Sequence, residues 1–210
     1  MGLMEYILFA AGSLFMIMDP ISLIPVFVAI TPEDTPQQRE KMARLACLVA
    51  AGVLIFFMII GKKLFSLMGI TLPAFKIAGS IVLLLIALDM LRAQRSRVQQ
   101  TNEETDAAAA KEDIAITPLA VPLLAGPGAI SSVILLEDRA KGWAQEVALV
   151  FCIGAVCAAS YFVLRLAAHG ATWINPIAMR IVTRIMGLLL AAVAIQFILD
   201  AIAEQKGRLF

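Results

Sequence analysis

An acidic residue stands in the middle of the first apolar stretch of the chain, where it could bind an ammonium group or a coupling proton. Asp19 lies about 15 residues into the apolar run of residues 4–30, and a helical rise of 1.5 Å per residue places it roughly 20 Å from the start, near mid-bilayer. A bare carboxylate there costs at least about 2.5 to 3.5 kcal/mol. Asp19 must therefore be partnered, hydrated or protonated. The alternative is a capping role, in which Asp19 opens a new helix with Pro20 at its first position.

A second segment with chemical potential, Gly126-Pro127-Gly128, lies in another apolar stretch, residues 114–136. Proline leaves an upstream carbonyl without its helical donor, and glycine lets the backbone approach a ligand closely. The helix that follows would present its first amides as a positive N-terminus, a suitable site for a carboxylate. These amides belong to Gly128, Ala129 and Ile130. A plain packing kink with small residues at a helix crossing explains the same pattern, so both interpretations stay open.

Other polar side chains in the apolar stretches are candidates for weaker contacts. Ser22 and Ser131, each close to one of these two segments, could add hydroxyl contacts to a ligand. Lys76 and Arg184 stand near the start of later stretches, where snorkelling to the headgroups is the default explanation, and Gln196 could form an interhelical hydrogen bond. With the flanking prolines, the predicted binding residues are Asp19, Pro20, Ser22, Pro25, Pro122, Gly126, Pro127, Gly128, Ala129, Ile130 and Ser131, and Asp19 is also the predicted ion-coupling residue.

Motifs for catalysis, metal binding and nucleic-acid binding do not occur in the sequence. It contains no nucleophile elbow, no zinc-spaced histidine and glutamate pair and no phosphate-binding loop, so we expect neither an enzyme nor a bound metal or cofactor. A net charge of +1 and 7% aromatic residues favour no nucleic-acid partner. Cys47, Cys152 and Cys157 lie in apolar stretches and are expected to be small buried residues.

The elements that must position these residues are transmembrane helices. Hydrophobic residues make up 61% of the 210 residues and charged residues only 16%, against roughly 25% charged residues in a soluble domain. The mean hydropathy is +0.90. The apolar stretches, each near the roughly 20 residues that a span needs, lie approximately at residues 4–30, 43–61, 73–91, 114–136, 147–168 and 181–202. The sequence therefore predicts an all-α membrane protein in a lipid bilayer, with about six transmembrane helices.

The two halves of the chain carry the same proline spacing. Pro20 and Pro25 are five residues apart in the first stretch, and the same pair recurs 102 residues later in the fourth. In the third stretch of each half a basic residue, Lys76 or Arg184, is followed directly by isoleucine and, three residues on, by glycine. Chance is the alternative, because prolines and glycines are frequent in transmembrane helices. We divide the chain into a first three-helix repeat (1–92), a hydrophilic inter-repeat loop (93–113) and a second three-helix repeat (114–210).

A repeat with an odd number of spans must invert, because the chain ends each repeat on the opposite face of the membrane. Inverted repeats are typical of secondary transporters, whose substrate sites lie near the midplane where interrupted helices of the two halves meet. The first and fourth stretches supply such interruptions. The basic residues of the connections are biased to the side of Arg39, Lys41 and Arg92, which predicts that both termini lie outside the cytoplasm.

At DPISLIPVF (residues 19–27) and PLAVPLLAGPGAI (residues 118–130), the sequence resembles the MarC family of bacterial inner-membrane proteins, formerly an uncharacterised family. The resemblance covers essentially the whole chain. It implies a bacterial inner-membrane location, the same inverted three-plus-three plan, and membership of a wider amino-acid exporter superfamily. In that membrane, the termini predicted from the basic residues would be periplasmic. Some archaeal relatives are reported as neutral amino acid transporters coupled to protons or sodium. The family supplies no agreed binding residues, so those named above rest on physical reasoning.

These observations favour a secondary transporter of a small neutral zwitterion such as alanine, glycine or serine, working by alternating access. The amides after Gly126 would hold the carboxylate, and Asp19 would face the ammonium or the coupling proton. Because Val121 matches Asp19 in the repeat, the site should be lopsided toward the first span. Two rivals stay open, a non-transporting membrane scaffold and an exporter of cations or larger amphiphiles. A small polar cavity would favour amino acids and a wide apolar one amphiphiles. The oligomeric state, a homo-oligomer included, is also open.

Overall fold

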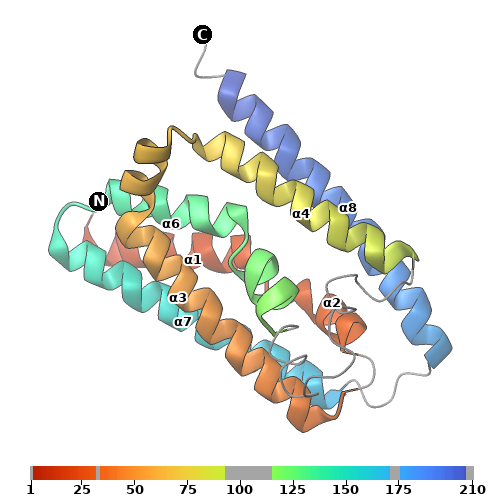
Figure 1. Cartoon of the computed structure of the whole chain (residues 1–210). Coiled ribbons are helices and arrows are strands. Elements are labelled where there is room, and N and C mark those ends of the chain that lie inside the picture. The colour runs from red at the N-terminus through yellow and green to blue at the C-terminus, as the bar shows by residue number, and fades with distance from the viewer. Residues whose placement is uncertain (1, 32–33, 93–114, 171–175, 207–210) are drawn as a thin grey trace.

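A computed structural model describes residues 2–31, 34–92, 115–170 and 176–206, and every regular element in these ranges is a helix (Figure 1). The predicted inter-repeat loop, 93–113, lies outside the described residues. The prediction of an all-α protein is confirmed. In chain order the elements are α1 (Leu3–Met18), α2 (Leu23–Ile30), α3 (Pro36–Met68), α4 (Leu72–Arg92), η2 (Ala115–Leu124), α6 (Pro127–Arg139), α7 (Trp143–Gly170) and α8 (Pro176–Lys206).

The helices have the lengths and the apolar composition of membrane spans. By these two criteria α3, α4, α7 and the Ile181–Gln205 part of α8 can each cross a bilayer. Two further spans are each made of two helices that meet at a short break, α1 with α2 at a bend of 44°, and Thr117–Leu124 with α6 at a bend of 47°. The described residues therefore hold up to 6 spans, and the first span of each half is the broken one, as the sequence predicts.

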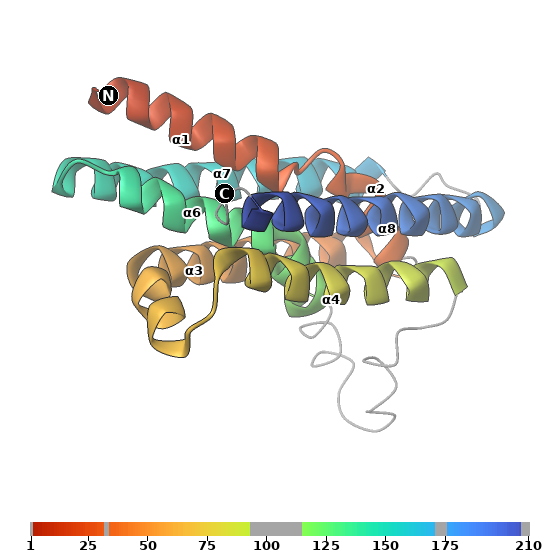
Figure 2. The same ribbon diagram turned by 90° about the horizontal axis from the view of Figure 1, so that it is seen from above.

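The order of one broken span and two long helices occurs twice along the chain. Matching helices run in opposite directions through the molecule: α1 and α2 against η2 and α6, α3 against α7, and α4 against α8 (Figure 1, Figure 2). α3 packs along α7, and α4 packs along α8 in the most extensive pairing among the described helices. This antiparallel pairing of equivalent helices is the arrangement expected of inverted repeats.

The apolar side chains form two clusters rather than one. The larger cluster joins α1, α2, α3, η2, α6 and α7, which we call the main bundle, around residues such as Leu14, Phe27, Leu54 and Ile153. The smaller cluster lies where α4 and α8 meet α2, and we call these two helices the α4–α8 pair. Its buried members are Val26, Ala29, Leu83, Ala87, Met90, Leu190 and Ala194. The predicted burial of the cysteines is confirmed for Cys47, Cys152 and Cys157.

Local hydrogen bonds set the start of α3 and hold it against the end of α2. The Thr35 hydroxyl accepts from the Gln38 amide at 3.3 Å, while the Gln38 side chain accepts from the Thr35 amide at 3.0 Å, a reciprocal cap. Arg39, only 3% exposed, donates through Nε and Nη2 to the Thr31 carbonyl at 3.0 and 2.7 Å. The guanidinium thus satisfies a carbonyl just past the end of α2 and fixes the exit of the first broken span.

Candidate functional site

The first span breaks at residues 19–22, between α1 and α2. Asp19 closes α1 in a left-handed conformation, with φ 36° and ψ 65°, and its amide donates to the Phe15 carbonyl at 3.0 Å. The Asp19 carboxylate accepts a hydrogen bond from the Ser22 amide at 3.3 Å, and α2 begins only at Leu23. The Asp19 carbonyl also accepts from the Leu23 amide at 3.3 Å. Asp19 therefore makes both hydrogen bonds of a cap toward the second helix, with Pro20 directly after it, although regular α2 begins three residues later.

The fourth span breaks at Ala125 and Gly126, after the irregular helical segment η2. Within η2, Thr117 and Val121 have extended backbone, with φ and ψ of −129° and 117° and of −131° and 121°. Each of these residues precedes a proline, and the residue before a proline is driven away from helical angles by the proline ring. The Ala125 amide donates to the Ala120 carbonyl at 2.8 Å, across a turn wider than that of an α-helix. This irregularity is therefore encoded locally.

Two glycines allow close packing at the break of the fourth span, because a side chain at either position would collide with a neighbouring atom. A Cβ on Gly126 would lie 2.6 Å from the Pro122 carbonyl oxygen, and a Cβ on Gly79 of α4 would lie 2.8 Å from the Pro127 ring. Real Cβ atoms do not approach other atoms so closely. Gly79 thus lets α4 pack directly against the first turn of α6, and the break itself is buried.

The first turn of α6 presents two unused amides rather than the three predicted. Gly126 caps the helix, Pro127 is its first residue, and the Ile130 amide already donates to the Gly126 carbonyl at 2.9 Å. The amides of Gly128 and Ala129 belong to the turn that has no carbonyl partner within the helix. The prediction for Ile130 is wrong, because Ile130 begins the ordinary hydrogen-bond ladder of α6.

A cavity of about 520 Å³ connects the two breaks. Its volume falls within the range of about 300–1,000 Å³ that is usual for ligand sites. Both broken spans contribute to its lining, and the α4–α8 pair lines the other side. The broken spans contribute Ile17, Met18, Asp19, Ser22, Leu23, Val26, Pro122, Leu123, Leu124, Gly126, Gly128 and Ala129, and the α4–α8 pair contributes Leu83, Met186, Leu189, Leu190, Ala192, Val193, Gln196 and Phe197.

The cavity is electrostatically uneven. Among the described residues that line it, Asp19 is the one with an ionisable side chain. The N-terminus of α6 brings the opposite sign, because aligned peptide dipoles place about half a positive charge there. Most of the remaining lining is apolar. Within the described part of the chain, no three histidine, cysteine, aspartate or glutamate side chains gather into a group that could hold a metal ion.

Comparison with known sequences agrees with the broken-span architecture. Residues 4–205 match the profile of a family described as MarC family integral membrane protein. The chain belongs to the MarC family. Similar relatives are UPF0056 membrane proteins from Aquifex aeolicus (36% identity, 90% of this chain and 89% of the relative), Methanocaldococcus jannaschii (35%, 95% and 97%) and Escherichia coli, where it is called YhcE (34%, 90% and 88%). No solved structure matches the chain. This MarC family chain is therefore an integral multi-pass membrane protein.

The cavity brings together some of the residues that the sequence singles out and leaves others aside. Those that line it are Asp19, Ser22, Pro122, Gly126, Gly128, Ala129 and Gln196. Those that do not are Pro20, Pro25, Pro127, Ile130, Ser131, Lys76 and Arg184. Ser131, expected to offer a hydroxyl to a ligand, is buried and donates to the Pro127 carbonyl of its own helix at 2.6 Å. The prolines outside the lining shape the breaks and do not face the cavity.

Two polar residues of the α4–α8 pair have partners other than those expected. Lys76 Nζ lies 2.5 Å from the Glu204 carboxylate of α8, so an interhelical ion pair takes the place of simple snorkelling. Gln196 donates to the Asp200 carboxylate at 2.8 Å, a bond within α8 rather than to another helix. Arg184 is exposed on α8. The ion pair joins the two helices of the α4–α8 pair at one end.

Sequence reasoning missed the apolar side of the site in this MarC family protein. Met186, Leu189, Val193 and Phe197 of α8 line the cavity at steps of three and four residues. This spacing places them on one face of the helix, together with Gln196. In the sequence, only Gln196 could have indicated which face of α8 lines the cavity. The apolar residues around it could not, because α8 is apolar on its other faces as well.

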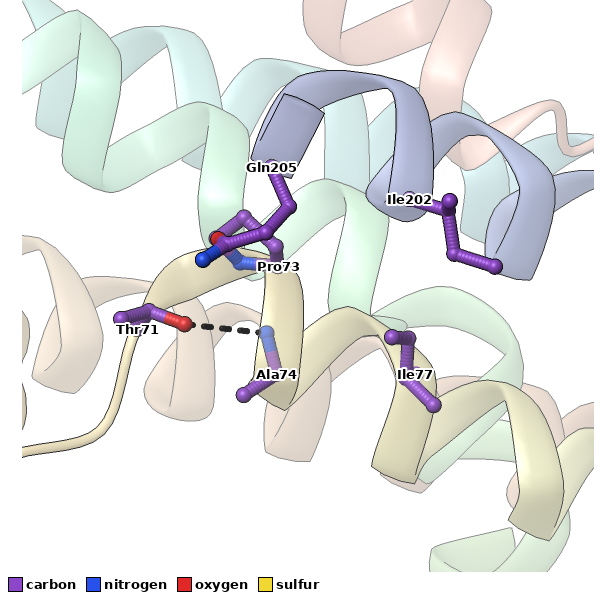
Figure 3. Close-up of a pocket in the computed structure, with 6 residues that line it drawn as sticks. All are labelled: Thr71, Pro73, Ala74, Ile77, Ile202 and Gln205. Carbon is purple, nitrogen blue, oxygen red and sulfur yellow. Dashed lines mark hydrogen bonds between the residues drawn. The ribbon is translucent and has the colours of Figure 1, made fainter. Parts of the chain in front are cut away.

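A second hollow of about 310 Å³ lies between the start of α4 and the end of α8 (Figure 3). The Ala74 amide donates to the Thr71 hydroxyl at 3.3 Å, so Thr71 caps the start of α4. No residue predicted for binding lines this hollow, and its described lining carries no charge. The lining consists of Thr71, Pro73, Ala74, Ile77, Ile202 and Gln205. The larger cavity is therefore the candidate site.

Proposed function

We propose that this MarC family protein is a secondary transporter of small neutral amino acids or similar zwitterions in the bacterial inner membrane, with both termini on the periplasmic side. The observation that carries the proposal is the cavity of about 520 Å³ that joins the breaks of the first and fourth spans. Transporters built from inverted repeats bind substrate where their discontinuous helices meet. No covalent chemistry is part of the proposal, and no cofactor is needed.

The charges at the two breaks support a zwitterionic substrate. The Asp19 carboxylate, which lines the cavity, would attract an ammonium group or carry a coupling proton. The amides of Gly128 and Ala129, at the positive end of α6, would hold a carboxylate. A molecule that carries both groups and no net charge satisfies both ends of the cavity at once.

The division of the molecule into two apolar clusters supports alternating access. The cavity lies between the main bundle and the α4–α8 pair, so a movement of the pair against the bundle would open or close it. The Lys76–Glu204 ion pair joins α4 to α8 and would keep the pair together during such a movement. The close approach of Gly79 to Pro127 is one place where the pair and the main bundle meet.

A transport assay in liposomes tests the proposal. Purified protein is reconstituted, and uptake of radiolabelled amino acids or substrate-induced current on a solid support is followed with and without an imposed pH gradient. We expect uptake of at least one neutral amino acid above empty liposomes. Absence of uptake and current for every member of the panel, with protein that melts cooperatively in the same lipid, would sink the proposal. The scaffold hypothesis predicts that absence.

A specific observation favours one rival, export of cations or larger amphiphiles. Most of the residues that line the cavity are apolar, and wide apolar cavities suit amphiphiles. The amides of α6 oppose this rival for cations, because the positive end of a helix repels them. Uptake of a fluorescent lipophilic cation in the same liposomes, without uptake of any neutral amino acid, would establish the rival.

A further inference from the structure

We infer that the transported zwitterion carries a large apolar side chain, as leucine, methionine and phenylalanine do, and that α8 selects it. The inference rests on the proposed function and concerns the same cavity. It assigns a role to the α8 residues that line the cavity, which the charges at the two breaks do not explain. It also differs from the expectation of alanine, glycine or serine, which took account of the breaks alone.

The charged and backbone polar groups of the cavity lie on one side only, among apolar residues such as Leu23 and Leu123, and the other side is apolar apart from Gln196. Asp19, Ser22 and the first amides of α6 lie on the side of the broken spans, whereas Leu83 of α4 and the lining residues of α8 lie on the other. Gln196 is the polar residue on the α8 side, and its amide nitrogen already donates to Asp200 at 2.8 Å. A ligand that matches this arrangement has a charged end for the breaks and an apolar end for α8.

The size of the cavity suits a ligand larger than the smallest amino acids. A volume of about 520 Å³ accommodates a ligand much larger than glycine or alanine. With such a small ligand, water would remain against the side chains of Met186, Leu189 and Val193, which line the cavity. Each methylene group that replaces this water raises affinity about fourfold. We therefore expect leucine or methionine to bind roughly tenfold or more tightly than alanine.

Two adjacent leucines of α8 offer a matched test of the wall. Leu189 lines the cavity and is 53% exposed, whereas Leu188 does not line it and is 63% exposed. Leu189→Trp would fill part of the cavity, and Leu188→Trp makes the same chemical change outside it. The measurement is binding and uptake of leucine, methionine and alanine by the full-length protein in lipid, for the wild type and both variants.

For Leu189→Trp we expect leucine affinity to fall roughly fivefold or more, because the added ring overpacks the cavity, while alanine affinity changes less. Leu188→Trp should leave both affinities near those of the wild type. The wild-type ranking of leucine over alanine tests the inference even where the Leu189 variant does not fold. A Leu189 variant that folds and keeps the wild-type preference would overturn the role of α8.

The outcomes separate this inference from the proposed function. Uptake of alanine or glycine with an affinity equal to or better than that of leucine would overturn the inference and leave the transporter proposal standing. No binding or uptake of any neutral amino acid by folded protein would overturn both. Leucine preference with loss of that preference in Leu189→Trp alone would support both.

Discussion

The break in the first span and the break in the fourth span occupy equivalent places in the repeat but are built differently. The first depends on an acid, Asp19, which takes a left-handed conformation and accepts a hydrogen bond from the Ser22 amide. The second depends on prolines and on Gly126, and it is buried beneath α4. The two copies of the repeat thus share a similar bend, 44° and 47°, while the residues that form it differ in chemistry.

This difference teaches that the two halves can recognise different parts of one ligand. The first break places a negative group at the cavity, and the second places the positive end of α6 there. Two identical breaks would have presented the same charge twice, which suits an ion better than a zwitterion.

The largest effect is expected from removal of the charge at the first break. Asp19→Asn should lower transport about tenfold to a hundredfold, because a hydrogen bond to a charged group contributes about 1.5–3 kcal/mol. It should also weaken the dependence on a pH gradient, since the amide carries no exchangeable charge. Melting should change little, because the Asn oxygen can still accept from the Ser22 amide. Uptake in liposomes is the measurement.

Asp138→Asn is the control for this prediction. Asp138 is also an acid in a broken span, but it lies at the far end of α6, pairs with Lys62 and does not line the cavity. Its variant should transport as the wild type does. Equal losses in both variants would mean that Asp19 has no special part, and the proposed asymmetry of the halves would fail.

The second break should be the more sensitive to added bulk. Gly126→Ala would place a Cβ 2.6 Å from the Pro122 carbonyl oxygen, so we expect a loss of about 1–3 kcal/mol in stability from overpacking. Gly12→Ala in α1 is the control, because a Cβ there meets no atom within 4 Å. Thermal melting in detergent measures both. Equal melting temperatures for the two variants would show that the second break is not tightly packed.

Removal of the Asp19 side chain should change the stability of the protein little but should reduce transport. A left-handed conformation costs a residue with a side chain about 1–2 kcal/mol, and glycine does not pay this cost. In Asp19→Gly this gain in stability should offset loss of the hydrogen bond between the Asp19 carboxylate and the Ser22 amide. We expect stability within about 1 kcal/mol of the wild type and transport as low as in Asp19→Asn. A variant that melts far below the wild type would indicate that Asp19 is mainly structural, as in the scaffold hypothesis.

The smallest effect is expected at the ion pair that joins α4 to α8. Glu204 is 47% exposed in its side chain and Lys76 only 16%, and partly exposed ion pairs contribute roughly 0.2–1 kcal/mol. Glu204→Gln should therefore lower stability by no more than about 1 kcal/mol, and exchange of the two residues, Lys76→Glu with Glu204→Lys, should restore it. A double-mutant cycle by thermal melting checks this. A coupling energy of zero would mean that the ion pair does not help to hold α4 and α8 together.

Much of the fold could be predicted from local sequence. Apolar stretches near 20 residues predict spans because a bilayer needs that length. The extended conformations of Thr117 and Val121 follow from the prolines after them, and the cap at Gly126 follows from the same rule that places proline at the first helical position. The role of Asp19 was less accessible, since acids occur both as N-caps and in left-handed turns, and the conformation depends on how α1 meets α2.

The sequence by itself determined where the spans lie, where two of them break and which break carries an acid. These properties depend on hydropathy, on missing proline amides and on the identity of single residues, all of which are local. Only the tertiary structure decided which face of α8 lines the cavity and that Lys76 meets Glu204, 128 residues away. In a membrane protein, faces toward lipid and faces toward a neighbouring helix are both apolar. Periodicity therefore cannot distinguish a cavity wall from a lipid contact.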